Sequence, residues 1–153
     1  MKNVLEFLEK TAPVCGDKTA FSDGVESLSF AELAQLSRAG GSALIARGLK
    51  NEPVAVFMKK APKTIAAFFA VLYAGCYYVP LDASMPLYRL QMIFEQLSPR
   101  AVVCDDASRE LAERLSPEGS VISASELFAV EENAEALAAV RAKCIDTDPA
   151  YIV

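Results

Sequence analysis

Short apolar runs alternate along the chain with longer segments in which apolar residues recur every three to four positions. The runs predict strands buried on both faces of a sheet, and the spaced segments predict helices. We expect strands at residues 53–58, 77–81, 101–105 and 120–123. We expect helices at residues 3–11, 30–47, 62–74, 86–97 and 108–115, a short one from 125, and one from 134 to about 143. Strands separated by helices predict right-handed βαβ units, hence an α/β fold with a doubly wound, mostly parallel sheet and helices on both faces.

Residues 19–22 and 27–30 flank the pair Asp23-Gly24, which is a turn signal. They predict a small N-terminal hairpin ahead of the sheet. Pro117 and Gly119 predict a second turn, just before the last of the four strands.

The helix after the hairpin carries two local signals. Ser29 and Glu32 have the spacing of a capping box, in which each side chain accepts a hydrogen bond from the other residue's backbone. Gly40 and Gly41 lie within the helix, where glycine costs stability relative to alanine. We therefore expect close packing of this helix against another element.

Composition indicates one folded domain and excludes several classes of protein. The chain has 153 residues, of which 53% are hydrophobic and 23% charged, so it can bury a sizeable core. Its net charge of -5 disfavours nucleic acid as a partner. No run of about 18 apolar residues is present, and charges interrupt the N-terminus, so we expect neither a membrane span nor a signal peptide. The expected location is the cytoplasm.

The mean hydropathy of +0.26 is high for a domain of this size. A mostly buried α/β core explains it, and so does a surface that belongs against further protein. The two explanations stay open at this point.

The sequence offers few residues for chemistry. It contains no histidine, which removes Ser-His-Asp and Cys-His catalytic units. The phosphate-binding motif G-x-x-x-x-G-K-S/T is absent, and so is the dinucleotide-binding motif G-x-G-x-x-G. The four cysteines match no metal or redox spacing, so we interpret them as reduced and mostly buried thiols: Cys15, Cys76, Cys104 and Cys144.

Three acids lie near predicted strand ends. Asp82, Asp105 and Asp106 could hold Mg²⁺, as in flavodoxin-like regulatory domains, or could cap helices, which is the commoner use. Arg89 in a first helical turn opposes the helix dipole, so we expect a tie to Asp82. Tyr73, Tyr77 and Tyr78 are interpreted as the core and rim of one strand and not as a stacking surface.

Three segments in order resemble the core motifs of amino acid adenylation domains, which belong to the adenylate-forming, AMP-binding ligases. The segment 28–33 is similar to the first motif, and residues 148–153 resemble the lead-in to the third, the phosphate loop. The second motif is matched by Ala74, Gly75, Tyr78, Val79, Pro80, Leu81, Asp82, Pro86, Arg89 and Leu90. Cys76 and Tyr77 depart from the usual Gly and Ala, and the D-alanine–carrier protein ligases carry a similar variant.

The resemblance implies an enzyme that joins a carboxylate, most simply an amino acid, to ATP. The acyl group would then pass to the phosphopantetheine thiol of a carrier protein or to coenzyme A. ATP and Mg²⁺ are implied for the whole enzyme. In such proteins the phosphate loop and the catalytic lysine lie further along the chain, so we assign no catalytic, cofactor-binding or metal residue to this sequence.

The last residues, 151–153, form an apolar run that looks like a strand with its continuation removed. We therefore expect residues 1–153 to be a single truncated subdomain, inactive alone, whose partner is the remainder of its own adenylation domain. We also expect a tendency to self-associate. The alternative is a self-contained flavodoxin-like binding or regulatory domain without catalysis.

Overall fold

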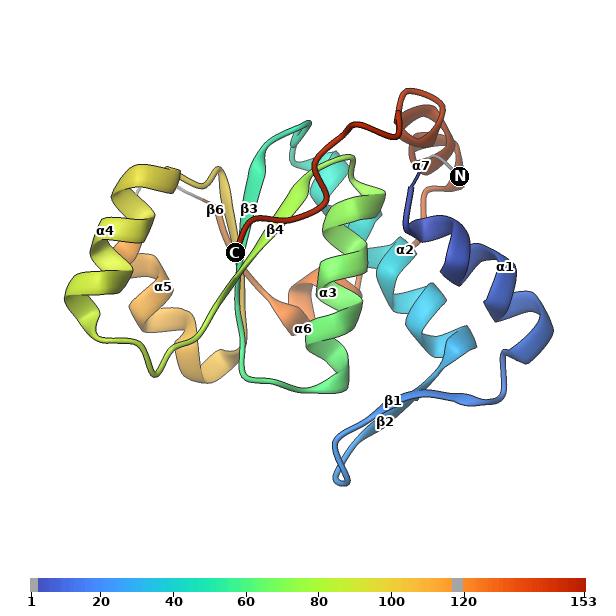
Figure 1. Ribbon diagram of the computed structural model, residues 1–153, viewed down its shortest axis with the longest axis horizontal. Helices are drawn as coiled ribbons and strands as arrows, with labels where there is room; N and C mark the ends of the chain where they lie inside the picture. Colours follow the sequence, from blue (N-terminus) through green and yellow to red (C-terminus); the bar gives the residue numbers. More distant parts are fainter. Residues whose placement is uncertain (1–2, 117–119) are drawn as a thin grey trace.

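A computed structural model describes residues 3–116 and 120–153, so the turn predicted at Pro117 and Gly119 lies outside the described residues. Within this part of the chain an antiparallel hairpin precedes a parallel sheet flanked by helices (Figure 1). The helices are α1 (Leu5–Cys15), α2 (Phe30–Ala46), α3 (Pro62–Tyr73), α4 (Leu87–Leu97), α5 (Arg109–Leu115), α6 (Ala124–Phe128) and α7 (Ala134–Arg141), with a 3₁₀ turn η1 (Asp106–Ser108). The strands are β1 (Thr19–Ser22), β2 (Ser27–Ser29), β3 (Pro53–Phe57), β4 (Tyr77–Leu81), β5 (Ala101–Cys104) and β6 (Ser120–Ser123).

The main sheet of the described residues has the order β4-β3-β5-β6, with every pair parallel. Central β3 pairs on both sides: Val54 lies opposite Tyr78 of β4 and Ala101 of β5. The expected doubly wound sheet is therefore confirmed, and so is the N-terminal hairpin, in which Phe21 pairs with Leu28.

Alternate side chains of β3 enter two different core layers. Val54 and Val56 pack with residues of α2, α3 and α6, whereas Ala55 and Phe57 face α4 and α5. The Phe57 ring meets the ring of Phe94 in α4 edge to face, with 6.3 Å between centroids. All strand residues from Val54 to Phe57 are buried, which explains why the strand is a continuous apolar run.

Helices α2 and α3 cross at the two glycines of α2. A Cβ on Gly40 would lie 2.7 Å from the Ala70 Cβ, and one on Gly41 would lie 2.6 Å from the Tyr73 Cβ. The expected close packing is confirmed, and it lets one helix layer cover this face of the sheet.

Capping boxes set the starts of two helices, and the end of a third helix differs from the expectation. The Ser29–Glu32 capping box is present at the start of α2. A second capping box, Ser123 with Glu126, starts α6 one residue earlier than expected. Helix α1 runs to Cys15, well past the expected end at residue 11.

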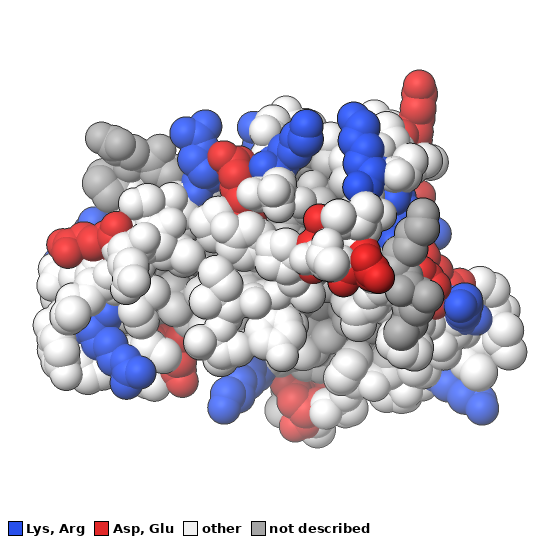
Figure 2. Space-filling view, turned by 45° about the horizontal axis from the view of Figure 1, so that its top comes forward, with Lys and Arg blue, Asp and Glu red and all other residues white. Residues whose placement is uncertain are grey.

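Charged side chains are unevenly spread over the surface. Figure 2 shows a face whose middle is largely free of Lys, Arg, Asp and Glu, with the charges mostly along its rim. None of the helices among the described residues has the length and apolar character needed to cross a membrane.

Candidate functional site

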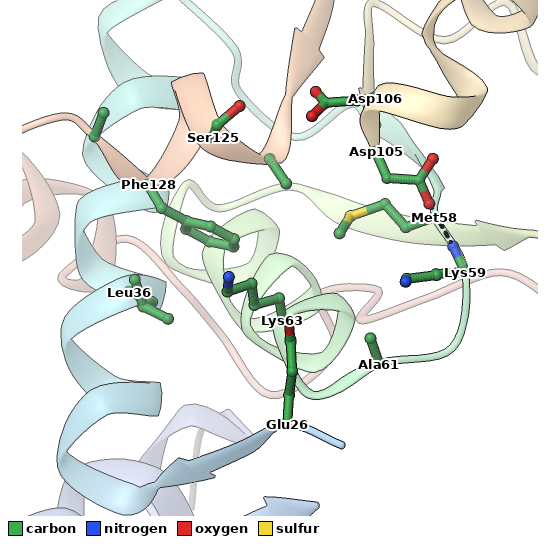
Figure 3. A pocket seen from close by; sticks show the side chains of 12 residues that line it. Glu26, Leu36, Met58, Lys59, Ala61, Lys63, Asp105, Asp106, Ser125 and Phe128 are labelled. Atoms are coloured by element: carbon green, nitrogen blue, oxygen red, sulfur yellow. Dashed lines mark hydrogen bonds between the residues drawn. The ribbon is translucent and has the colours of Figure 1, made fainter. Parts of the chain in front are cut away.

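The carboxyl edge of the parallel sheet is where open α/β folds place ligands. The chain runs from β3 to β4 on one side and then crosses to β5 on the other side of β3. The connections therefore diverge between the ends of β3 and β5. A cavity of about 450 Å³ lies there, between the strand ends and helices α2, α3 and α6 (Figure 3). Met58, Leu36 and Phe128 supply apolar walls.

Asp105 follows β5 at the edge of this cavity, and both of its carboxylate oxygens are engaged. Oδ2 accepts the Lys59 backbone N–H at 2.9 Å, which ties β5 to the end of β3 (Figure 3). Oδ1 accepts the backbone N–H of Ser108 at 2.9 Å, which caps η1. Burial alone would raise the pKa of Asp105, but the hydrogen bonds from Lys59 and Ser108 outweigh it and leave this pKa below its ordinary value.

These contacts support capping as the role of Asp105. Asp106 and the side chains of Lys59, Lys63 and Ser125 also line the cavity. Among the described residues no group of three or more His, Cys, Asp and Glu side chains comes together as a metal site. Both Asp105 oxygens accept backbone N–H groups, which is the arrangement of a capping carboxylate.

Asp82 and Arg89 are not paired, so the expected tie is wrong. Asp82 follows β4, and its Oδ1 accepts the Ser84 backbone N–H at 2.8 Å. In the described part of the chain no ion pair involves Arg89, which is exposed in the first turn of α4. The Asp82 carboxylate therefore stabilises the turn after β4 and forms no ion pair with helix α4 in the described residues.

Three cysteines, Cys76, Cys104 and Cys144, are buried, and Cys15 is partly buried. Burial raises the pKa of Cys104 to about 11, so its thiol stays protonated at neutral pH. The interpretation of the cysteines as reduced, mostly buried thiols is confirmed.

The outer edge of β4 holds the end of the chain. The Tyr78 N–H donates to the Ala150 carbonyl at 3.1 Å, and the Ile152 N–H donates to the Tyr78 carbonyl at 3.0 Å. The Tyr78 ring stacks on Phe68 of α3 at 4.3 Å between centroids and on Tyr151 at 5.6 Å. The expected terminal strand is thus reduced to one parallel bridge, and Tyr78 has a stacking role that the sequence interpretation missed.

A groove of about 860 Å³ opens beside the carboxyl end of β4. Phe68, Pro80 and Met85 are among its apolar walls, and Lys60 and Asp82 also line it. The two hollows flank the end of β3, since Met58 and Lys59 line both.

The fold is an open α/β scaffold, a class of protein that binds ligands beyond the carboxyl ends of its strands. The family model for AMP-binding enzymes matches residues 8–153. The chain therefore belongs to the AMP-binding enzyme family.

The curated relatives are large synthetases. The chain is 35% identical over 120 residues to tenellin synthetase of Beauveria bassiana, a match that covers 76% of this chain and 3% of that protein. It is 27% identical over 153 residues to tyrocidine synthase 1 of Brevibacillus parabrevis, a match that covers 99% of this chain and 14% of that protein. The chain thus spans a small part of the length of these relatives.

Solved structures agree on the fold. VinN in complex with 3-methylaspartate superposes with a TM-score of 0.77 at 20% identity, covering 98% of this chain and 43% of that one. The nonribosomal peptide synthetase FmoA3, bound to alpha-methyl-L-serine-AMP, superposes with a TM-score of 0.73 at 27% identity. This match covers 80% of this chain and 14% of that one. The scaffold is that of the N-terminal subdomain of adenylate-forming enzymes.

Proposed function

We propose that residues 1–153 are one truncated subdomain that serves as the opening scaffold of a longer adenylate-forming ligase. That enzyme would activate a carboxylate with ATP and Mg²⁺, releasing pyrophosphate. The observation that carries the proposal is that the family match covers nearly this whole chain, yet the chain covers only 14% to 43% of structures such as FmoA3 and VinN.

An amino acid is the proposed substrate class, and a carrier-protein phosphopantetheine thiol or coenzyme A the proposed acceptor. Support comes from the likeness to the nonribosomal peptide synthetase FmoA3, whose structure is bound to alpha-methyl-L-serine-AMP. The second-motif variant around Cys76 and Tyr77 adds a likeness to the D-alanine–carrier protein ligases. The proposed location is the cytoplasm, and the proposed direct partner is the remainder of the adenylation domain.

The role of this chain in catalysis is positional. Adenylation relies on groups that stabilise charge on the phosphates. In the described residues the cavity at the ends of β3 and β5 offers the lysines Lys59 and Lys63, while Asp105 is engaged in capping. The resemblance to the family implies that the phosphate loop and the catalytic lysine lie further along the chain. We therefore propose that no residue here is catalytic, cofactor-binding or metal-binding, and that the sheet instead places loops supplied by other parts of the enzyme.

ATP–pyrophosphate exchange tests the inactivity of the isolated chain. We expect the 153-residue protein to give no exchange above background with any amino acid, with Mg²⁺ present. Exchange that depends on both the amino acid and the protein would overturn the proposal that the isolated chain is inactive. A Lys59→Ala, Lys63→Ala double variant would then show whether the cavity is responsible.

A further inference from the structure

The free edge of β4 holds residues 150–152 by contacts that are few and well defined. They are the two backbone hydrogen bonds of Tyr78, the stack of its ring with Tyr151, and the packing of Ala150 against a buried cluster. The ring of Tyr78 is itself supported from behind by Phe68, at an interplanar angle of 13°. Three rings from a helix, a strand and the terminal segment thus meet in one column.

We propose that Tyr78 is a positioning residue that fixes the register of residues 150–152 on β4 and thereby sets where the following residues leave the sheet. The link to catalysis rests on the proposed function, in which those following residues include the phosphate loop. The geometric part of the proposal concerns this chain alone.

Register matters here because side chains alternate between the two sides of a strand. A slip of one residue would turn the Tyr151 ring to the opposite side of the strand, away from Tyr78. Ala150 packs against a buried cluster, whereas Tyr151 is 56% exposed and Ile152 is 44% exposed. The ring stack is therefore a contact that the observed register makes and that a one-residue slip would lose.

Pro80 limits how far the pairing can run. The backbone groups of a strand point alternately to its two neighbours, so after Tyr78 the next outward-facing position of β4 is Pro80. Proline has no N–H to offer to the Ile152 carbonyl. Pairing beyond the Tyr78 bridge is thus weakened at a defined point, where the chain can turn away from the sheet.

That point adjoins the large groove at the carboxyl end of β4. Phe68 and Pro80 line this groove, and Phe68 also belongs to the ring column. Residues that follow Ile152 would therefore leave the sheet beside this groove, at the edge where open α/β sheets bind ligands. Tyr78 would act on catalysis indirectly, through the place at which the loop begins.

Amide hydrogen exchange, followed by NMR on the 153-residue chain, tests the proposal. The readout is the exchange rate of the Ile152 N–H relative to that of the Val103 N–H in central β5. We expect Tyr78→Phe to keep the wild-type ratio and Tyr78→Leu to raise it by about fivefold or more. Equal ratios for the Phe and Leu variants would overturn the proposal.

Tyr151→Ala provides a second variant whose folding is not in question, because it changes an exposed residue at the chain end. It should raise the same ratio about as much as Tyr78→Leu. Tyr88→Ala, which removes an exposed ring on α4, should leave it unchanged. An Ile152 amide that exchanges as fast in wild type as in Tyr151→Ala would contradict the proposal.

A tyrosinate titration supplies a spectroscopic readout. Burial, followed by the proximity of Tyr151, raises the pKa of Tyr78 above its ordinary value of 10.0. Tyr151→Ala should lower this pKa toward that value, and an unchanged titration would count against the stack. Neither measurement involves ATP, so a negative result here leaves the ligase proposal standing, and inactivity in the exchange assay leaves this one standing.

Discussion

At the scale of single residues, Asp105 shows how a strand-end acid can be structural. Its two oxygens join the ends of β3 and β5 and cap η1. Sequence reasoning could place Asp105 at a strand end, but it could not choose between capping and metal binding. The deciding partner, Lys59, is 46 residues away in the sequence and becomes a neighbour only because β3 and β5 are adjacent.

Asp105→Asn should lower the free energy of unfolding by about 1–2 kcal/mol, because an amide keeps one of the two acceptors and loses the charge. The pKa of Asp105 is depressed in the folded state, so its stabilisation is present above the ordinary pKa of 3.8 and is lost as pH falls through the lower native value. Urea unfolding at neutral and acidic pH measures this.

Asp106→Asn is the matched control, since Asp106 is exposed and adjacent, and it should change stability by less than about 0.5 kcal/mol. The same two variants address the flavodoxin-like alternative. A Mg²⁺-dependent stabilisation of the wild type that Asp105→Asn abolishes would favour that alternative over the scaffold role.

At the scale of elements, the contact of α2 with α3 depends on the absence of side chains. The cost of glycine within a helix predicted that Gly40 and Gly41 pack closely against another element, but it could not say which one. Ala70 and Tyr73 of α3 fill the space that Cβ atoms would need. The two helices together form the layer over one face of the sheet, which explains why glycine stands in the middle of a helix.

Gly41→Ala should destabilise the protein even though alanine is the better helix former. Overpacking a close contact costs about 1–3 kcal/mol, against about 1 kcal/mol gained in helix propensity. We therefore expect a net loss of about 1 kcal/mol in chemical denaturation. Gln35→Ala, on the exposed side of α2, serves as the control and should be neutral or slightly stabilising. A stabilised Gly41→Ala protein would show that the helices separate without cost.

At the scale of the whole molecule, the fold was predictable because its strands are buried on both faces. The apolar runs at residues 53–58 and 101–105 needed no knowledge of their partners to be assigned as strands. The order of the strands, which creates the cavity and the groove, is not encoded in those runs. The contacts at the outer edge of β4 were harder still to predict, because no local sequence signal indicates that the Tyr78 ring stacks on both Phe68 and Tyr151.

The surface leads to an expectation about association. Helix α4 exposes three large apolar side chains, Leu87, Tyr88 and Met92, and within the described residues β4 is paired on its outer side at one bridge only. Exposed apolar patches and open strand edges promote contact between copies. We expect the isolated chain to self-associate as its concentration rises, measured by light scattering.

Met92→Lys should reduce this association, whereas Val14→Lys, at an exposed apolar position on α1, should not. The two helices lie at opposite ends of the molecule, so the pair separates a local surface from general hydrophobicity (Figure 1). A wild-type chain that stays monomeric at high concentration would contradict the expectation.

The central claim is that this sheet is the platform of a larger ligase. The most direct measurement is ATP–pyrophosphate exchange by the polypeptide from the complete reading frame, assayed beside the 153-residue chain with a panel of amino acids and other carboxylates. We predict carboxylate-dependent exchange by the complete polypeptide and none by the chain alone. A reading frame that ends at Val153, or a complete polypeptide that supports no exchange with any carboxylate, would contradict the claim.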